Sequence, residues 1–368
     1  MPSGKERMDL EHVLVAGGGS GGHVFPALAV AEQLEKRRWR VSWLGRVEGM
    51  ERDLVGRQGL EYHGLPARAI VGRSVGGRVL AMTDLGRSSW RARQLIRSLE
   101  VGVVVGTGGY ASAPGVMGAV LARRPAVLLE PNAVPGVANR WLSRFAAQAA
   151  IASDSAAAGL RCPCVETGVP VRADFSAPHQ PADTRGPLRL LVLGGSQGAR
   201  QLNDLLPPAL ESLGATQPGM QVTHQVGASL LDEARSAYAR RSMAGVEISV
   251  VPFLDDVFAA MAAAHLIISR AGAITLAEIC AVGRAALLLP LTLAGSHQLA
   301  NARSLAATGG AEALDPSRTT AEEFTDRLGA LVGNRQQLLE MGAALHGLAR
   351  PQAAADIADL VVEVARKN

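Results

Sequence analysis

Apolar runs alternate with segments of helical periodicity along most of the 368-residue chain. The run "HVLVAG" from His12 and the run "RVSWLG" from Arg40 predict two buried strands. Between them, "PALAVAEQLEKRR" predicts a helix that begins near Pro26, because proline favours the first helical turn. Further strands are predicted at "VGVVVGTGG", "PAVLLEPN" and "AAIASDS". Strands that alternate with helices indicate a parallel sheet with right-handed crossovers.

The pattern is interrupted at residues 170–187, where "PVRADFSAPHQPADTRGP" predicts a linker. It then restarts with strands predicted at "LRLLVLGG", "MQVTHQVG", "VEISVVPF", "HLIISR" and "AALLLPL", and with helices from Ala199 and through "ITLAEICAVG". An amphipathic helix is predicted from about Arg350 to Asn368. We therefore expect an α/β protein with two doubly wound, Rossmann-like domains at residues 8–170 and 171–349, the last helix packing back on the first domain.

Composition narrows the ligand class. Hydrophobic residues make up 48% of the chain and aromatic residues only 4%, so the core is expected to consist of Ala, Val and Leu. The net charge of +4 suits an anionic ligand or an anionic membrane surface, and charge alone does not exclude nucleic acid. The basic residues are unevenly distributed, since seven arginines and a single acid, Asp84, lie between Gly64 and Arg97.

The remaining composition points to an intracellular protein without a membrane span. Cys162, Cys164 and Cys280 lack the number and spacing of a zinc site or a disulfide framework, so free thiols are expected. The N-terminal segment lacks the apolar core of a signal peptide, and no run of about 18 apolar residues occurs. The sequence thus predicts a protein that is soluble or peripheral to a membrane.

Two glycine turns follow equivalent strands. The first has the spacing G-x-G-x-x-G at Gly17, Gly19 and Gly22, which is typical of dinucleotide sites. Such sites also need an acid at the end of the second strand, where this chain has Gly45 and Arg46, so an NAD enzyme is disfavoured. Both turns still suit phosphate, because backbone N–H groups, the positive end of the next helix and a serine hydroxyl (Ser20 or Ser196) can meet an anion. Alternatively, each is only a tight strand-to-helix turn.

Several polar residues near these turns are candidates for chemistry. His23 lies at the start of a helix whose dipole disfavours the imidazolium, so a neutral ring could accept a proton; the alternative is a packed or capping histidine. Glu278 could accept two ribose hydroxyls, or could be an acid in a first helical turn. Gln298 and Asn301 share a helix face and could bind sugar hydroxyls, or could be ordinary surface residues.

Seven blocks, in order and covering both halves, carry a more specific resemblance: "GGGSGGHVFPALAVA", "GTGGYASAPG", "EPNAVPGVANR", "TGVPVRADF", "GGSQGARQLN", "FLDDVFAAMAAAHLIISRAGAITLAEICAVGRAALLLPL" and "SHQLANA". With these blocks the chain resembles the MurG family, the transferases that add N-acetylglucosamine (GlcNAc) from UDP-GlcNAc to undecaprenyl-pyrophosphoryl-MurNAc-pentapeptide (lipid I) to give lipid II for peptidoglycan. The resemblance implies a GT-B glycosyltransferase fold of two Rossmann-like domains with a cleft between them. The N-terminal domain would take the lipid acceptor and associate with the membrane, and the C-terminal domain would bind the UDP-sugar.

The resemblance also implies roles for residues at matching positions. Ser20, Gly21 and Gly22 would face the donor diphosphate and sugar, Asn132 and Gln298 would contact the GlcNAc moiety, and Arg172 and Ser196 would serve the diphosphate. Leu254 would meet uracil through its backbone. The uridine site would comprise Ala273, Ile274, Thr275, Leu276, Ala277 and Glu278, with Glu278 on the ribose. The chain departs from the family pattern at Pro131, where glutamine is usual, at Ser296, where aspartate is frequent, and at Ser20, where threonine is common.

The family inverts the anomeric centre, and we take His23 as the hypothetical general base. No metal site is needed for this, and adjacent Asp255 and Asp256 should diverge, so we expect no required cofactor and at most a stimulatory divalent cation. The implied partners are UDP-GlcNAc, lipid I, other cell-wall synthesis proteins and, through the Arg68–Arg97 segment, the anionic cytoplasmic face of the bacterial inner membrane; nucleic acid is not expected. The alternatives are another GT-B lipid glycosyltransferase, a UDP-sugar 2-epimerase and a non-catalytic membrane scaffold.

Overall fold

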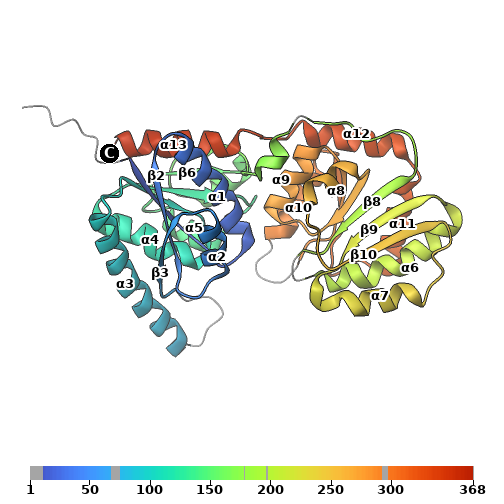
Figure 1. The fold of residues 1–368 in the computed structure, drawn as a ribbon, viewed down its shortest axis with the longest axis horizontal. Helices are drawn as coiled ribbons and strands as arrows, with labels where there is room; N and C mark the ends of the chain where they lie inside the picture. Colours follow the sequence, from blue (N-terminus) through green and yellow to red (C-terminus); the bar gives the residue numbers. More distant parts are fainter. Residues whose placement is uncertain (1–10, 68–74, 178, 196–197, 292–296, 368) are drawn as a thin grey trace, which may run out of the picture. The chain divides into compact units, whose positions relative to one another are not determined.

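The chain folds into two compact units. Unit 1 comprises Met1–Arg172 and Arg350–Asn368, and unit 2 comprises Ala173–Ala349. The backbone therefore passes between the units twice, near Arg172 and near Ala349. The computed structural model, drawn in Figure 1, describes residues 11–67, 75–177, 179–195, 198–291 and 297–367.

The described residues of unit 1 form a seven-stranded parallel sheet in the order β3-β2-β1-β4-β5-β6-β7. Its strands are β1 (His12–Ala16), β2 (Arg40–Arg46), β3 (Glu61–Leu65), β4 (Val103–Gly106), β5 (Ala126–Glu130), β6 (Gln148–Ile151) and β7 (Cys164–Glu166). Every residue of β1, β4 and β5 is buried. These strands are apolar without alternation because helices cover both faces of the sheet.

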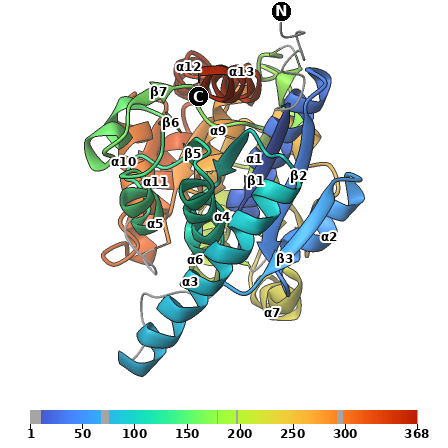
Figure 2. The ribbon, with the colours of Figure 1, turned by 90° about the vertical axis from the view of Figure 1, so that its left-hand side faces the viewer.

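Helices form a layer on each face of this sheet. They are α1 (Gly21–Lys36), α2 (Met50–Arg57), α3 (Val75–Ser98), α4 (Gly109–Ala122), α5 (Val137–Leu142) and α13 (Ala353–Lys367), with a short 3-10 helix η1 (Asp154–Gly159). On one face, α1 and α13 bury Val24 and Val361 against Val13 of β1. On the other face, α3 and α4 bury Ile96 and Val116 against Leu14, and Figure 2 shows these two helices alongside each other.

The described residues of unit 2 repeat this architecture with a six-stranded parallel sheet in the order β10-β9-β8-β11-β12-β13. The strands are β8 (Leu188–Leu193), β9 (Met220–Gln225), β10 (Val246–Val251), β11 (Leu266–Ser269), β12 (Ala285–Leu288) and β13 (Ala311–Ala313). The helices are α6 (Arg200–Thr216), α7 (Leu231–Ala239), α8 (Val257–Ala263), α9 (Ala273–Val282), α10 (His297–Ala306), α11 (Ala321–Val332) and α12 (Arg335–His346), with 3-10 helices η2 (Ala173–Ser176) and η3 (Ala228–Leu230). The prediction of two doubly wound, Rossmann-like domains is confirmed.

Helix α1 begins five residues before the predicted position. It starts at Gly21, after Ser20 in an extended conformation, and Pro26 lies inside it. A proline there removes the hydrogen bond to the carbonyl of Gly22. Gly22 is exposed, so water can satisfy that carbonyl, and the helix continues through the proline.

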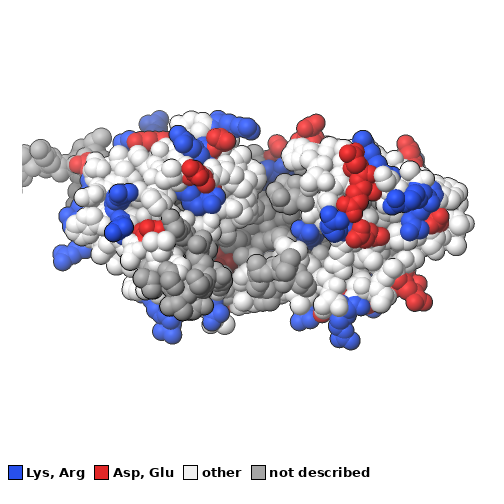
Figure 3. Space-filling model, turned by 90° about the horizontal axis from the view of Figure 1, so that it is seen from below, with Lys and Arg blue, Asp and Glu red and all other residues white. Residues whose placement is uncertain are grey.

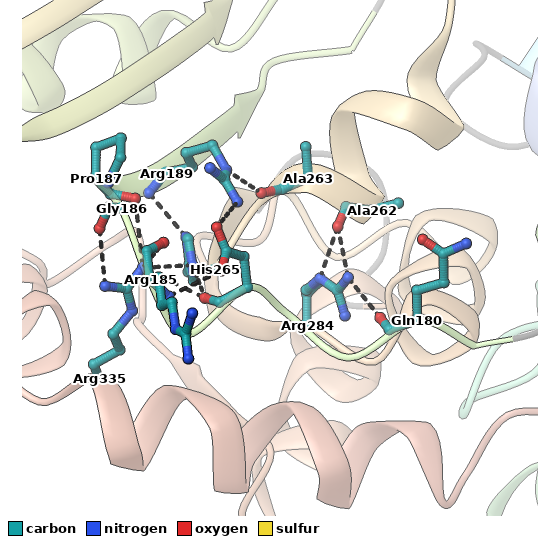
Figure 4. A network of polar contacts seen from close by, with 11 residues as sticks. Gln180, Arg185, Gly186, Pro187, Arg189, Ala262, Ala263, His265, Arg284 and Arg335 are labelled. Atoms are coloured by element: carbon teal, nitrogen blue, oxygen red, sulfur yellow. Dashed lines mark hydrogen bonds and ion pairs between the residues drawn. The ribbon is translucent and has the colours of Figure 1, made fainter.

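The segment predicted as a linker is bound to unit 2 after Arg172. Arg284, only 2% exposed, donates from its guanidinium to the carbonyl oxygens of Gln180 at 2.8 Å and of Ala262 at 3.2 Å (Figure 4). Further along, His265 accepts from the amide of Arg189 at Nδ1, 2.9 Å away, so its proton is on Nε2 and is donated to the carbonyl of Asp183 at 2.6 Å. Burial lowers the pKa of His265 and keeps this arrangement neutral.

Two arginines outside this segment bind its backbone. Arg335 of α12 donates to the carbonyl of Gly186 at 3.0 Å, and Figure 4 shows it beside Gly186 and Pro187. Burial lowers the pKa of Arg284 to about 10, which still leaves it charged at neutral pH. The backbone of residues 179–189 is therefore bound to the rest of unit 2 by hydrogen bonds. Within the described part of the chain, every helix is too short or too polar to span a bilayer.

Candidate active site

The glycine turn of unit 1 connects β1 to α1 at the carboxyl end of the sheet. A Cβ atom on Gly17 would lie 1.8 Å from Oγ1 of Thr107, and one on Gly18 would lie 2.3 Å from the carboxyl carbon of Glu51. Gly19 has a φ of 92°, a conformation that favours glycine. The turn therefore needs glycine at all three positions, for space or for backbone conformation.

The start of α1 presents N–H groups to its surroundings. The carbonyl of Ser20 accepts from the amides of His23 at 3.1 Å and Val24 at 3.3 Å. Gly21 and Gly22 occupy the first helical positions, where backbone N–H groups have no acceptor within the helix. The first turn of α1 carries no acid that would offset the positive end of the helix dipole. These two amides are thus suited to an anion.

The ring of His23 is fixed by the neighbouring strand and turn. Its Nδ1 lies 2.8 Å from the carbonyl oxygen of Thr107, at the end of β4. A carbonyl can only accept, so Nδ1 donates, and in the neutral ring Nε2 is the basic nitrogen. Cβ atoms on Gly108 and Gly109 would lie 3.2 Å and 3.3 Å from this ring, which explains the two glycines at the start of α4. A small pocket beside His23 is also lined by Gly22, Thr107, Glu130 and Pro131.

A buried carboxylate organises the loop after β5. Glu130, 3% exposed, accepts from the backbone amide of Asn132 at 3.0 Å and from its side-chain amide at 2.9 Å. The other carboxylate oxygen accepts from the amide of Gly136 at 2.9 Å and from the side chain of Asn139 at 3.0 Å. Asn132 is therefore anchored next to Pro131.

A second buried carboxylate lies beneath the first glycine turn, and the sequence pattern does not single it out. Glu51 of α2 has a side chain that is 0% exposed, and it accepts from the amide of Gly19 at 3.2 Å. We expected the amides of this turn to face a phosphate, but the amide of Gly19 is directed inward. Only part of the turn is left to bind an anion.

The glycine turn of unit 2 is held in the same manner by an amide side chain. Gln225, at the end of β9 and 5% exposed, accepts from the amide of Gly195 at 2.9 Å and donates to its carbonyl at 3.0 Å. Gly195 and Gly198 have φ values of 78° and 74°. Ser196, predicted to serve the diphosphate, lies outside the described residues, as does Ser296.

The candidate uridine site of unit 2 lies at the start of α9. Gly272 precedes the helix, and Ala273 to Glu278 form its first residues. The first turn contains no acid, and Glu278 is 5% exposed in the following turn, so the interpretation as a first-turn acid is wrong. Leu254, half-buried, lies between β10 and α8, where Asp256 caps α8 by accepting from the amide of Ala259 at 2.8 Å.

The two amides of α10 have separate contacts. The side-chain oxygen of Gln298 accepts from the amide of Leu291 at 2.8 Å. Asn301 is 5% exposed and donates to the carbonyl of Ala271 at 3.2 Å, which ties α10 to the turn before α9. Asn301 is therefore a buried structural residue rather than a surface one.

The candidate residues thus form two sets. Unit 1 brings together Ser20, Gly21, Gly22 and His23 around the start of α1, and it also carries Asn132 and, as its last residue before unit 2, half-buried Arg172. Unit 2 carries the other described candidates, from Leu254 to Gln298. The described residues contain no group of three His, Cys, Asp or Glu side chains that could hold a metal ion.

Comparison with known proteins gives consistent matches over both units. Residues 13–151 match the model of the glycosyltransferase family 28 N-terminal domain, and residues 189–361 match that of the C-terminal domain. The chain is 41% identical over 360 residues to the UDP-N-acetylglucosamine–N-acetylmuramyl-(pentapeptide) pyrophosphoryl-undecaprenol N-acetylglucosamine transferase of Ralstonia nicotianae, covering 96% of each protein.

Solved structures agree. The crystal structure of MurG from Acinetobacter baumannii superposes with a TM-score of 0.81 at 34% identity, covering 96% of this chain and 99% of that one. A putative UDP-N-acetylglucosamine 2-epimerase from Listeria monocytogenes gives a TM-score of 0.70 at 11% identity, over 98% of both chains. At that identity the second likeness concerns the fold alone.

Proposed function

The chain belongs to the MurG family of glycosyltransferases, and we propose that it transfers GlcNAc from UDP-GlcNAc to the C4 hydroxyl of MurNAc in lipid I, forming lipid II. The near-complete span of the sequence match to a transferase of this name carries the proposal. The 2-epimerase hypothesis has only the shared fold in its favour, because the corresponding structural likeness lies at 11% identity.

Unit 2 is the proposed donor-binding unit. The carboxylate of Glu278, buried on α9, can accept two hydroxyl groups of a ribose. The N-terminus of α9, with no acid in its first turn, presents positive potential nearby. The backbone of Leu254 would contact uracil, and Gln298 would contact the sugar.

Unit 1 supplies the proposed chemistry. The C4 oxygen of MurNAc attacks C1 of GlcNAc, its proton passes to Nε2 of His23, and the bond between C1 and the phosphate oxygen breaks as UDP leaves. The hydrogen bond from Nδ1 to Thr107 sets the required tautomer, and the positive end of α1 disfavours a charged ring before reaction. The amides of Gly21 and Gly22, together with Ser20, Ser196 and Arg172, would stabilise the departing diphosphate, and Asn132 would hold the sugar.

The lipid acceptor requires contact with a membrane, for which α3 is the proposed surface. Leu80, Met82 and Trp90 are 46%, 64% and 52% exposed, and Arg91 and Arg97 are exposed on the same helix. Basic side chains also lie along the lower rim of unit 1 in Figure 3. Apolar side chains interleaved with arginines suit an anionic lipid surface, so we propose a peripheral enzyme at the cytoplasmic face of the inner membrane. Arg68 and Arg73 of the predicted segment lie outside the described residues, as does the side chain of Arg78.

Incubation with UDP-GlcNAc and a water-soluble lipid I analogue should release UDP in a one-to-one ratio with the new disaccharide. Mass spectrometry of the acceptor and a coupled UDP assay measure both products. Conversion of UDP-GlcNAc without acceptor would indicate an epimerase, and the absence of disaccharide would contradict the proposed transfer.

Substituting His23→Gln should lower kcat by about 10²–10⁴-fold, because the neutral amide cannot accept the proton. The dissociation constant for UDP-GlcNAc, measured separately by calorimetry, should change little. His63→Gln on the edge strand β3 is the matched control. A near-normal kcat for His23→Gln would remove this residue from the role of base.

Substituting Glu278→Gln should weaken UDP binding by about 10–100-fold, since a hydrogen bond to a charged group contributes about 1.5–3 kcal/mol. Titration calorimetry measures the change, and binding of the acceptor analogue should be unaffected. Glu340→Gln on α12 is a control of the same chemistry. Unchanged UDP affinity would refute the ribose assignment.

Flotation with vesicles should show binding that rises with the fraction of anionic phosphatidylglycerol and falls with salt. Arg91→Ala should weaken it about fivefold at low salt, given about 1 kcal/mol per basic residue near such a surface. Trp90→Ser should also weaken it, whereas Leu348→Ser, which alters an exposed leucine of unit 2, should not. Vesicle binding that depends neither on lipid charge nor on the substitutions Arg91→Ala and Trp90→Ser would count against α3 as the membrane surface.

A further inference from the structure

Glu51 is a buried charge that hydrogen-bonds to the first glycine turn and to Arg46 at the end of β2. One carboxylate oxygen accepts from the backbone amide of Arg46 at 3.0 Å and from its Nε at 3.3 Å, and the other accepts from the amide of Gly19 at 3.2 Å. Burial opposes ionisation, but these donors outweigh it and hold the pKa of Glu51 below its ordinary value. The carboxylate therefore stabilises the folded unit above about pH 4.5, and this contribution is lost as the pH falls through the lower folded pKa.

The surrounding glycines make room for this carboxylate. A Cβ on Gly18 or on Gly49 would lie 2.3 Å or 2.2 Å from atoms of the Glu51 carboxyl group, and one on Gly45 would lie 3.0 Å from its Cγ. These glycines come from the turn before α1, the turn before α2 and strand β2. The glycine at position 18 is thus explained by an internal side chain rather than by a ligand.

Arg46 connects Glu51 to the start of α4, the element that packs against the His23 ring. Its Nη1 donates to the hydroxyl of Tyr110 at 3.0 Å, and its guanidinium carbon lies 5.8 Å from the centre of that ring. Tyr110 is in the first turn of α4, directly after Gly108 and Gly109, which pack against the His23 ring. A second phenol, that of Tyr62, donates to the carbonyl of Arg46 at 2.6 Å and fixes its backbone.

We propose that Glu51 is a positioning residue for His23, acting through Gly19 on the start of α1 and through Arg46 and Tyr110 on the start of α4. The imidazole belongs to α1 and packs against Gly108 and Gly109 at the start of α4, so a shift of either helix start moves Nε2 relative to the attacking hydroxyl. The inference rests on the proposed function for its catalytic consequence, but the contacts of Glu51 with the two turns do not depend on it.

Glu51→Gln tests this role while preserving the shape of the side chain. Its amide oxygen can still accept from Arg46, but its NH₂ group then faces the amide of Gly19, and two donors cannot pair. We expect kcat to fall about 10²-fold, as for a small misplacement of a catalytic group. Asp53→Asn, an exposed carboxylate on the same helix, is the matched control and should keep the wild-type kcat.

A double-mutant cycle distinguishes a positioning effect of Glu51 on His23 from a general loss of enzyme structure. In a His23→Gln background, Glu51→Gln should lower the remaining rate by less than about threefold, because residues that act as a unit are not additive. A further 10²-fold loss in that background, or a wild-type kcat for Glu51→Gln alone, would overturn the proposal.

An activity-independent measurement keeps the inference separate from the proposed reaction. Hydrogen exchange of the Gly19 amide, followed by NMR, should be slow in the wild-type protein and accelerated in Glu51→Gln. Fast exchange in the wild type would overturn the contact itself, whatever reaction the enzyme catalyses. If Glu51→Gln does not fold, Gly18→Ala supplies the same test, since its Cβ displaces the turn from the carboxylate, and an unchanged kcat in that variant would refute the inference.

Discussion

Each unit fixes its glycine turn with one buried polar side chain beneath it, Glu51 under Gly19 in unit 1 and Gln225 under Gly195 in unit 2. Glycine gives a turn the conformations it needs but also leaves it many others. A hydrogen bond donated by the glycine amide to a buried acceptor removes that freedom before any ligand arrives. The amides that remain at the helix start are then preorganised, which is the property that electrostatic stabilisation of a leaving group requires.

Glu51 is charged and Gln225 is neutral, and this difference matches the function proposed for each unit. A carboxylate places negative charge under the turn of unit 1, where Arg46 balances it and connects the turn to α4. A neutral amide in unit 2 both accepts from and donates to the same glycine, and it adds no charge near a diphosphate. In unit 1, the proposed catalytic unit, Arg46 thus links the glycine turn to α4, whereas the anchor of unit 2, the proposed donor-binding unit, is uncharged.

The sequence predicts the central strands well because burial on both faces produces continuous apolar runs. Three of the four edge strands, β3, β7 and β13, are missed: β7 and β13 have only three residues, and β3 includes Glu61, His63 and Gly64. The fourth edge strand, β10, is predicted because four of its six residues are Val or Ile. The sequence does not identify Glu51 for another reason. It belongs to a polar helix, where an acid is expected to be on the surface, and only the fold buries it. Its one local signal is a pair of preceding glycines, Gly45 and Gly49, neither of which has a positive φ that would itself require glycine.

The discontinuous nature of unit 1 affects its biosynthesis. Helix α13 supplies Ile357, Val361 and Val364 to the core beside α1, yet all of unit 2 is translated before it. At 5–20 residues per second, the ribosome leaves that apolar surface of the nascent chain uncovered for roughly tens of seconds. Unit 2 can complete its core first, and α13 closes unit 1 only afterwards.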